Sequence, residues 1–187
     1  MKPKLYLLGA SCSGVSTLGA ALSERLDVPQ IDVDDFYWMP TDPPFSFKRD
    51  PEDRVLLISQ RQQMGEGWVL TGSFIGWGDT LIEDIHLIID IHTPTPTRLA
   101  RLDQREALRH DARILPGDDM HRSHLAFRDW ASRYDDPLFP GRSCAQHEQW
   151  LEAQPASVLR FDGECEIEEL VRRVEEAISH MDIPTLA

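Results

Sequence analysis

The stretch from Leu5 to Leu18 constrains the fold of this chain more than any other. It reads LYLLGASCSGVSTL, so an apolar run ends at Gly9 and four small residues lead to a second glycine, Gly14. Apolar residues then recur at helical spacing from Leu18 onward. This order indicates a buried strand, a tight glycine loop and the first turn of a helix.

The glycine loop has the spacing G-x-x-x-x-G-K-[ST] of a phosphate-binding loop, with one departure. Gly9, Gly14 and Ser16 match the pattern, but Val15 stands where the pattern has lysine. Backbone N–H groups and the dipole of the following helix hold phosphate oxygens in such loops. The alternative is a glycine-rich turn that binds nothing. The residues expected to form the cradle, with the Ser16 hydroxyl on Mg²⁺, are Gly9, Ser11, Cys12, Ser13, Gly14, Val15, Ser16 and Thr17.

Composition limits the class of protein. The chain has 187 residues, enough for one domain with a small insertion, and we expect a single domain over 1–187. A formal net charge of −13 and the lack of a dense Lys/Arg block argue against nucleic-acid binding. Three cysteines are too few for a disulfide framework, and no apolar stretch is long enough for a signal peptide or a membrane span. We therefore expect a cytoplasmic protein without a membrane partner.

Short apolar runs alternate with amphipathic segments along the rest of the chain. Parallel strands need crossover connections, so this alternation predicts an α/β fold with a doubly wound, five-stranded parallel sheet and helices on both faces. The stretch at about 109–143 is expected to form a helical lid-like insertion. The expected strands are 5–8, 30–33, 68–71, 85–91 and 157–161. The expected helices are 16–26, 51–64, 97–113, 123–134, 143–153 and 166–181, with a helical turn near 79–83.

Acids and arginines follow the strands at regular places. Asp32 and Asp34 come after the second expected strand, and Arg101 and Arg105 lie one helical turn apart after the fourth. Gly163 follows the fifth strand. Ligands of doubly wound sheets bind outside the carboxyl ends of the strands, where these residues converge. Each also has a plain structural reading, as acids in a solvated turn, arginines on an exposed helix and a glycine required only by a turn.

Together, the glycine loop, the acid pair, the arginine pair and Gly163 resemble the small P-loop kinases of the adenylate, shikimate and gluconate kinase superfamily. The resemblance covers most of the chain. It implies the strand order 2-3-1-4-5 and the cofactors ATP and Mg²⁺. It further implies that Asp32 helps hold Mg²⁺ through water and that Asp34 hydrogen-bonds the acceptor hydroxyl, in some members as a base. Arg101 would lie near the adenine, Arg105 would reach phosphate from the lid, and Gly163 would let the backbone approach the adenine ring.

Val15 leaves two functions open. The missing lysine normally stabilises charge during phosphoryl transfer, so its loss should matter. Either another cation substitutes, and the chain is an ATP-dependent phosphotransferase acting on a small-molecule or nucleotide acceptor, or it is a nucleotide-binding regulatory protein with weak or lost kinase activity. An acceptor base at Asp34 favours the enzyme, and Val15 itself favours the regulator. The candidate substitutes are Lys48, Arg49, Arg101, Arg105 and Arg142.

Two further groups of residues have competing readings. One group has the pair spacing of a structural zinc site, although such pairs also arise by chance in helices. A zinc-stabilised interaction domain without nucleotide is therefore a third, weaker hypothesis for the function. The members of this group are His121, His124, Cys144 and His147. The other group comprises aromatic residues that either wall an acceptor pocket or belong to the core. These are Tyr37, Trp38, Phe74 and Trp77.

Overall fold

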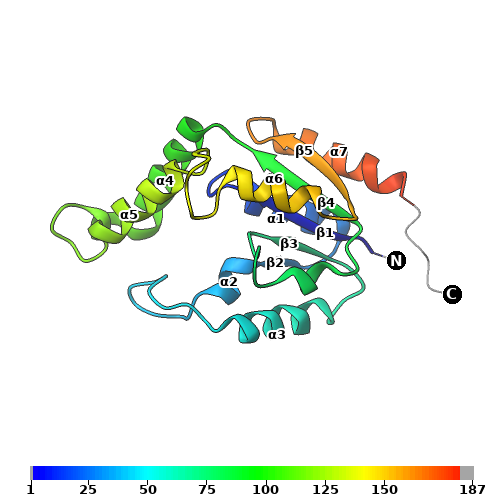
Figure 1. Cartoon of the computed structure of the whole chain (residues 1–187), viewed down its shortest axis with the longest axis horizontal. Coiled ribbons are helices and arrows are strands. Elements are labelled where there is room, and N and C mark those ends of the chain that lie inside the picture. The colour runs from blue at the N-terminus through cyan, green and yellow to red at the C-terminus, as the bar shows by residue number, and fades with distance from the viewer. Residues whose placement is uncertain (1, 182–187) are drawn as a thin grey trace.

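The computed structural model describes residues 2–181 and is organised around a five-stranded sheet (Figure 1). The strands lie in the order β2-β3-β1-β4-β5, and every neighbouring pair is parallel. The expected doubly wound α/β fold and its strand order are therefore confirmed. The strands are β1 (Lys4–Gly9), β2 (Gln30–Asp32), β3 (Trp68–Thr71), β4 (Leu87–His92) and β5 (Ser157–Asp162).

Apolar side chains are buried on both faces of the sheet. Leu5 and Leu7 belong to one core cluster, together with side chains of α1 and α7, whereas Tyr6 and Leu8 belong to a second cluster with side chains of α3 and α6. Side chains alternate between the faces of a strand, so only an unbroken apolar run fills both clusters. The helices on the two faces are α1 (Val15–Leu26), α7 (Ile167–Ser179), α3 (Pro51–Gln62) and α6 (Cys144–Glu152).

The segment after β2 differs from the expectation. The expected strand 30–33 ends at Asp32, and a short helix, α2 (Val33–Tyr37), replaces the expected loop. Asp32 causes this change, because its side-chain Oδ1 accepts a hydrogen bond of 3.0 Å from the Asp34 amide and so caps the helix. The cap fixes the position of Asp34 relative to the end of the sheet.

The two α-helices that directly follow β4 along the chain extend beyond the carboxyl end of the sheet (Figure 1). The expected helix 97–113 is α4 (Thr95–His110), followed by a 3₁₀ turn, η2 (Asp111–Ile114), and then α5 (His121–Ser132) packs against α4. A further 3₁₀ turn, η1 (Asp79–Ile82), precedes β4. The lid role of 109–143 stays a prediction. No helix within residues 2–181 is both long and apolar enough to cross a membrane.

Candidate functional site

The glycine loop joins β1 to α1 at the carboxyl edge of the sheet. Gly9 is the last residue of β1, and α1 begins at Val15. Gly14 has a φ of 108° and Cys12 a φ of 64°, whereas Ser13 between them is not left-handed. A φ of 108° is open to glycine and strained for other residues. Backbone that alternates in this way is typical of the nests that bind anions.

Val15 is not oriented as a phosphate-contacting side chain. It is 8% exposed and packs in the core cluster that lies between the sheet and α1. Only the backbone N–H of Val15, and not its side chain, therefore stays a candidate for phosphate contact. The position carries no charge, and its side chain contributes to the core.

Ser16, Asp32 and Asp34 are linked by hydrogen bonds. The Ser16 hydroxyl donates to Asp32 Oδ2 at 2.8 Å, and Asp32 Oδ1 accepts from the Asp34 amide. Ser16 and the neighbouring Thr17 are exposed at the start of α1. Asp32 thus connects the glycine loop with the helix that bears Asp34, so the structure brings together the acids and the hydroxyl that the sequence singled out.

Asp34 lies in a mixed electrostatic environment. It is solvent-accessible, yet protein atoms crowd round it enough that desolvation raises its pKa, and the Asp32 carboxylate raises it further. Arg142 and Arg105 act in the opposite direction and lower the pKa of Asp34. A solvent-accessible carboxylate that two arginines influence electrostatically can accept a proton while an anion is held close by.

Arg142 reaches the glycine loop from the connection between α5 and α6. Its Nη2 donates to Ser11 Oγ at 2.8 Å, and its guanidinium lies 4.9 Å from the centre of the Trp130 ring. Its Nε is buried and has no hydrogen-bond partner among the described residues. Burial lowers the pKa of Arg142, and Asp34 opposes that effect. An unpaired donor of this kind is typical of a site made for an anion.

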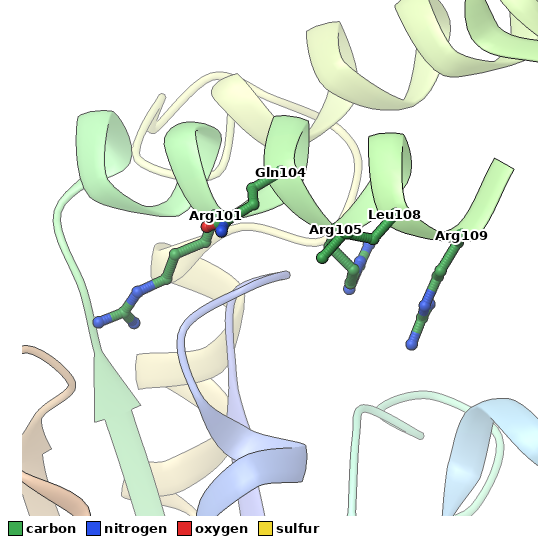
Figure 2. Close-up of a pocket in the computed structure, with 5 residues that line it drawn as sticks. All are labelled: Arg101, Gln104, Arg105, Leu108 and Arg109. Atoms are coloured by element: carbon green, nitrogen blue, oxygen red, sulfur yellow. The ribbon is translucent and has the colours of Figure 1, made fainter. Parts of the chain in front are cut away.

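The arginines of α4 line a cavity of about 320 Å³ beside the loop, together with Gln104 and Leu108. Figure 2 shows Arg101, Arg105 and Arg109 leaving α4 on the side where the glycine loop lies, with Arg101 and Arg105 nearer to the loop than Arg109. Arg101 donates to the Gly163 carbonyl at 2.9 Å and lies 3.5 Å from the Ser13 carbonyl. Arg105 has a buried Nε without a partner among residues 2–181. The arginine row therefore faces the site and not only solvent, except for Arg98, which is buried.

Gly163 lies directly against the glycine loop. A Cβ at this position would be 2.0 Å from Thr93 Oγ1 and 2.5 Å from the Ser13 carbonyl oxygen. Thr93 in turn donates a hydrogen bond of 2.9 Å to that same carbonyl. Only glycine allows the turn after β5 to approach this closely, so Gly163 sets the position of the loop.

A Gly163→Ala substitution is expected to displace Thr93 and break its bond to Ser13. We expect the free energy of unfolding to fall by about 1–3 kcal/mol, as for other overpacked positions, measured by denaturant titration. Gly65→Ala is the control, because its nearest non-neighbour atom would lie 3.5 Å from the new Cβ. Equal stability of the two variants would contradict the packing role of Gly163.

Two of the candidate cations, Lys48 and Arg49, contact the segment around α2. Lys48 Nζ is 5.6 Å from the centre of the Tyr37 ring, and Arg49 donates to the Phe36 carbonyl. Arg54, which the sequence analysis missed, is 6% exposed, and its guanidinium lies 4.0 Å from the Tyr37 ring centre. No sequence signal separates Arg54 from an exposed arginine of an amphipathic helix. Of the four aromatic residues, Phe74 is in the core, whereas the partly exposed ones are Tyr37, Trp38 and Trp77.

The zinc site suggested by the sequence does not form. Cys144 belongs to a group of three potential metal ligands whose donor atoms lie within 4.8 Å of one another. Among residues 2–181, no such group contains His121, His124 or His147. His121 is bonded to the Ile114 carbonyl, and His147 is 1% exposed and hydrogen-bonded to the Tyr134 hydroxyl at 2.9 Å. The pair spacing arises because each pair lies on its own helix.

His147 is expected to make the fold sensitive to acid. Burial lowers its pKa from 6.5 to about 3, so the folded chain keeps the imidazole neutral where the unfolded chain protonates it. The neutral imidazole makes its full contribution to the free energy of unfolding above about pH 6.5. As the pH falls towards about 3, the free energy of unfolding decreases by roughly 1.4 kcal/mol per pH unit. Denaturant titrations near pH 7 and pH 5 should therefore differ by about 2 kcal/mol from this group alone.

A His147→Gln variant is expected to lose that part of the pH dependence, whatever its stability near neutral pH. His180→Gln is the matched control, because His180 is exposed on the last turn after α7 and should leave the slope unchanged. A full acid slope in His147→Gln would show that His147 does not cause it.

Comparison with known proteins places the chain in a family. No protein-family model matches it. The "Uncharacterized protein YqaC" of Bacillus subtilis (strain 168) is 37% identical over 179 residues, which cover 96% of this chain and 99% of that protein. The chain belongs to the YqaC family.

Solved structures give the fold of this YqaC-family chain. A sugar kinase from Janibacter sp. HTCC2649 has a TM-score of 0.53 at 14% identity, covering 96% of this chain and 95% of that one. A shikimate kinase from Bacteroides thetaiotaomicron has a TM-score of 0.53 at 17% identity, covering 95% of this chain and 98% of that one. A gluconokinase from Sinorhizobium meliloti 1021 has a TM-score of 0.50 at 17% identity, covering 95% of this chain and 96% of that one. The YqaC-family chain therefore has the fold of the P-loop small-molecule kinases, as its motifs predict.

Proposed function

We propose that the chain is an ATP-dependent phosphotransferase that acts on the hydroxyl of a small-molecule or nucleotide acceptor. The observation that carries the proposal is the position of Asp34, which is tied through Asp32 to the glycine loop and has its pKa lowered by Arg142 and Arg105 against the larger effect of desolvation. A protein that only bound nucleotide would not need an acceptor base opposite two arginines. The named activities of the structural neighbours agree with this reaction class.

The residues present fit Mg²⁺ and a nucleotide. Magnesium prefers oxygen ligands, and the Ser16 hydroxyl and the Asp32 carboxylate are hydrogen-bonded at the end of the loop. The unpaired Nε donors of Arg105 and Arg142 suit phosphate oxygens. Ser16 and Asp32 would hold the metal, which neutralises charge on the phosphate oxygens when bound.

Each site residue then has a role in the proposal. The backbone from Ser11 to Thr17 holds phosphates, and Arg101, with the turn at Gly163, borders the base of the nucleotide. Asp34 accepts the proton of the acceptor hydroxyl. Arg142 supplies the positive charge that Val15 lacks, because its side chain already bonds Ser11 in the loop. Transfer depends mainly on such positioning and charge stabilisation.

The second candidate is a nucleotide-binding regulatory protein with weak or lost kinase activity. The apolar Val15, packed in the core in place of the lysine, favours it. The two candidates share a nucleotide site and differ in whether an acceptor reacts.

Calorimetric titration with Mg·ATP, followed by an ADP assay, separates the candidates. The assay uses a panel of sugars, hydroxy acids, nucleosides and nucleoside monophosphates, with and without each acceptor. Acceptor-dependent ADP supports the phosphotransferase. Binding without acceptor-dependent ADP across the panel supports the regulator, and no binding at millimolar ATP contradicts both candidates.

A further inference from the structure

Three potential metal ligands of different chemistry meet outside the nucleotide site. His92 is the last residue of β4, Asp135 follows α5, and Cys144 is the first residue of α6. One ligand atom from each residue lies within 4.8 Å of the other two. His92 and Asp135 are exposed and Cys144 is half-buried, so both an ion and water can reach the cluster.

Backbone hydrogen bonds hold the three residues in place. The His92 carbonyl accepts from the Gly163 amide at 2.7 Å, and the Cys144 amide donates to the Tyr134 carbonyl at 2.8 Å. The second bond places Cys144 against the residue that precedes Asp135. Elements far apart in the sequence thus present their ligands at one point without requiring a metal to bring them together.

The Asp135 carboxylate is already oriented. Its Oδ2 accepts from Thr95 Oγ1 and from Arg98 Nη2, the latter at 3.2 Å. Arg98 is 1% exposed and also bonds the Thr93 and Ala131 carbonyls. Both bonds fall on one carboxylate oxygen, so Oδ1 stays available to a metal, while Arg98 and Thr95 act as the outer partners that metal-binding carboxylates usually have.

The surrounding charge favours a cation. Desolvation raises the pKa of the Cys144 thiol, and the nearby carboxylates of Glu148, Asp135 and Asp90 raise it further, whereas Arg98 lowers it. Arg160 pairs with Glu148 at 2.8 Å and so partly offsets its charge. A thiolate formed here would add negative charge beside these carboxylates, and a bound cation would offset it.

From this geometry we propose that His92, Asp135 and Cys144 bind Zn²⁺. One thiolate, one imidazole and one carboxylate are ligands that zinc prefers and that Mg²⁺ and Ca²⁺ do not, and water completes a tetrahedron. On binding, the Cys144 S–H bond breaks, a S–Zn bond forms, and the proton passes to solvent. The ion joins the end of β4 to the junction between α5 and α6, and so fastens the root of the 109–143 segment to the sheet.

The test is zinc binding by the full-length, untagged protein after removal of metal with a chelator. Calorimetry is expected to give one equivalent of Zn²⁺ at micromolar affinity or tighter, with an upward shift of the melting temperature. Co²⁺ in place of Zn²⁺ should give the thiolate-to-metal absorption band of a cysteine ligand. Neither readout depends on nucleotide or on kinase activity, so failure here is distinct from failure of the proposed function.

Variants separate this site from adventitious binding. Cys144→Ser should abolish the thiolate band and reduce zinc affinity at least tenfold, and His92→Gln should reduce affinity similarly while keeping the band. Cys165→Ser and His180→Gln, at exposed positions outside the cluster, should behave as wild type. Absence of stoichiometric binding, or a thiolate band that survives Cys144→Ser, would overturn the proposal. If Cys144→Ser does not fold, retention of full affinity by His92→Gln would overturn it.

Discussion

An Asp34→Asn variant is expected to lose between about 100-fold and 10,000-fold in acceptor-dependent ADP formation while keeping its affinity for Mg·ATP. The amide is the same size as the carboxylate but cannot accept the acceptor proton. Asp34 also has a pKa above its ordinary value of 3.8, set by desolvation and by Asp32. The wild-type rate should therefore fall on the acid side as Asp34 is protonated, and this limb of the pH profile should be absent from any residual activity of the variant.

Asp35→Asn is the matched control for this prediction. Asp35 is the next residue of α2 and is also exposed, and desolvation and Asp32 raise its pKa too, but no arginine acts on it. We expect the control to retain activity within a few-fold of wild type. A severe loss in Asp35→Asn with a mild one in Asp34→Asn would show that the neighbouring carboxylate is the base.

Arg142→Met is expected to lower turnover by about 100-fold to 1,000-fold, the usual effect of removing one preorganised donor from a charged transition state. Methionine keeps the apolar stem that packs near Trp130 and removes the charge. Because desolvation opposes the charge of the half-buried Arg142 and its Nε has no partner among the described residues, its removal should not lower the melting temperature of the free protein. The rise in melting temperature on adding Mg·ATP should be smaller than in wild type.

The pH profile distinguishes a charge role for Arg142 from a purely structural one. Arg142 lowers the pKa of Asp34, so its removal should move the acid limb of the residual activity to higher pH. Arg25→Met, at an exposed position on α1, is the control and should change neither turnover nor the profile. An unshifted acid limb in Arg142→Met would contradict the electrostatic effect of Arg142 on Asp34, and unchanged turnover would point to another cation as the substitute for lysine.

The strands and the glycine loop could be predicted because their signals are local. An unbroken apolar run such as 5–8 fits only a strand buried on both faces, and glycine at 14 fits a left-handed turn. The predicted boundaries of strands and helices were less accurate where a side-chain hydrogen bond, and not the apolar pattern of the sequence, ends one element and begins the next. Asp32 is the example, because its capping bond ends β2 and begins α2, and that bond depends on conformation.

Positions that depend on packing could not be predicted. In sequence, Arg98 and Arg105 belong to one row of arginines, but Arg98 is buried and fastens α4 to Asp135, whereas Arg105 faces the loop. Arg54 carries no local signal, and its stacking on Tyr37 exists only after α3 packs beside α2. The pairs His121/His124 and Cys144/His147 do not form a zinc site for the same reason, since spacing along a helix does not bring two helices together.

The sequence alone determined the order of strands and helices, the phosphate-binding loop and the absence of its lysine, because these follow from local periodicity and spacing. Only the tertiary structure decided which arginines lie close to this loop, and therefore which one we propose as the substitute for that charge. Arg142 is 127 positions from Val15 along the chain, and it reaches Ser11 because the α5–α6 connection returns across the carboxyl edge of the sheet. Contacts between such distant positions depend on how the layers pack, which no local pattern encodes.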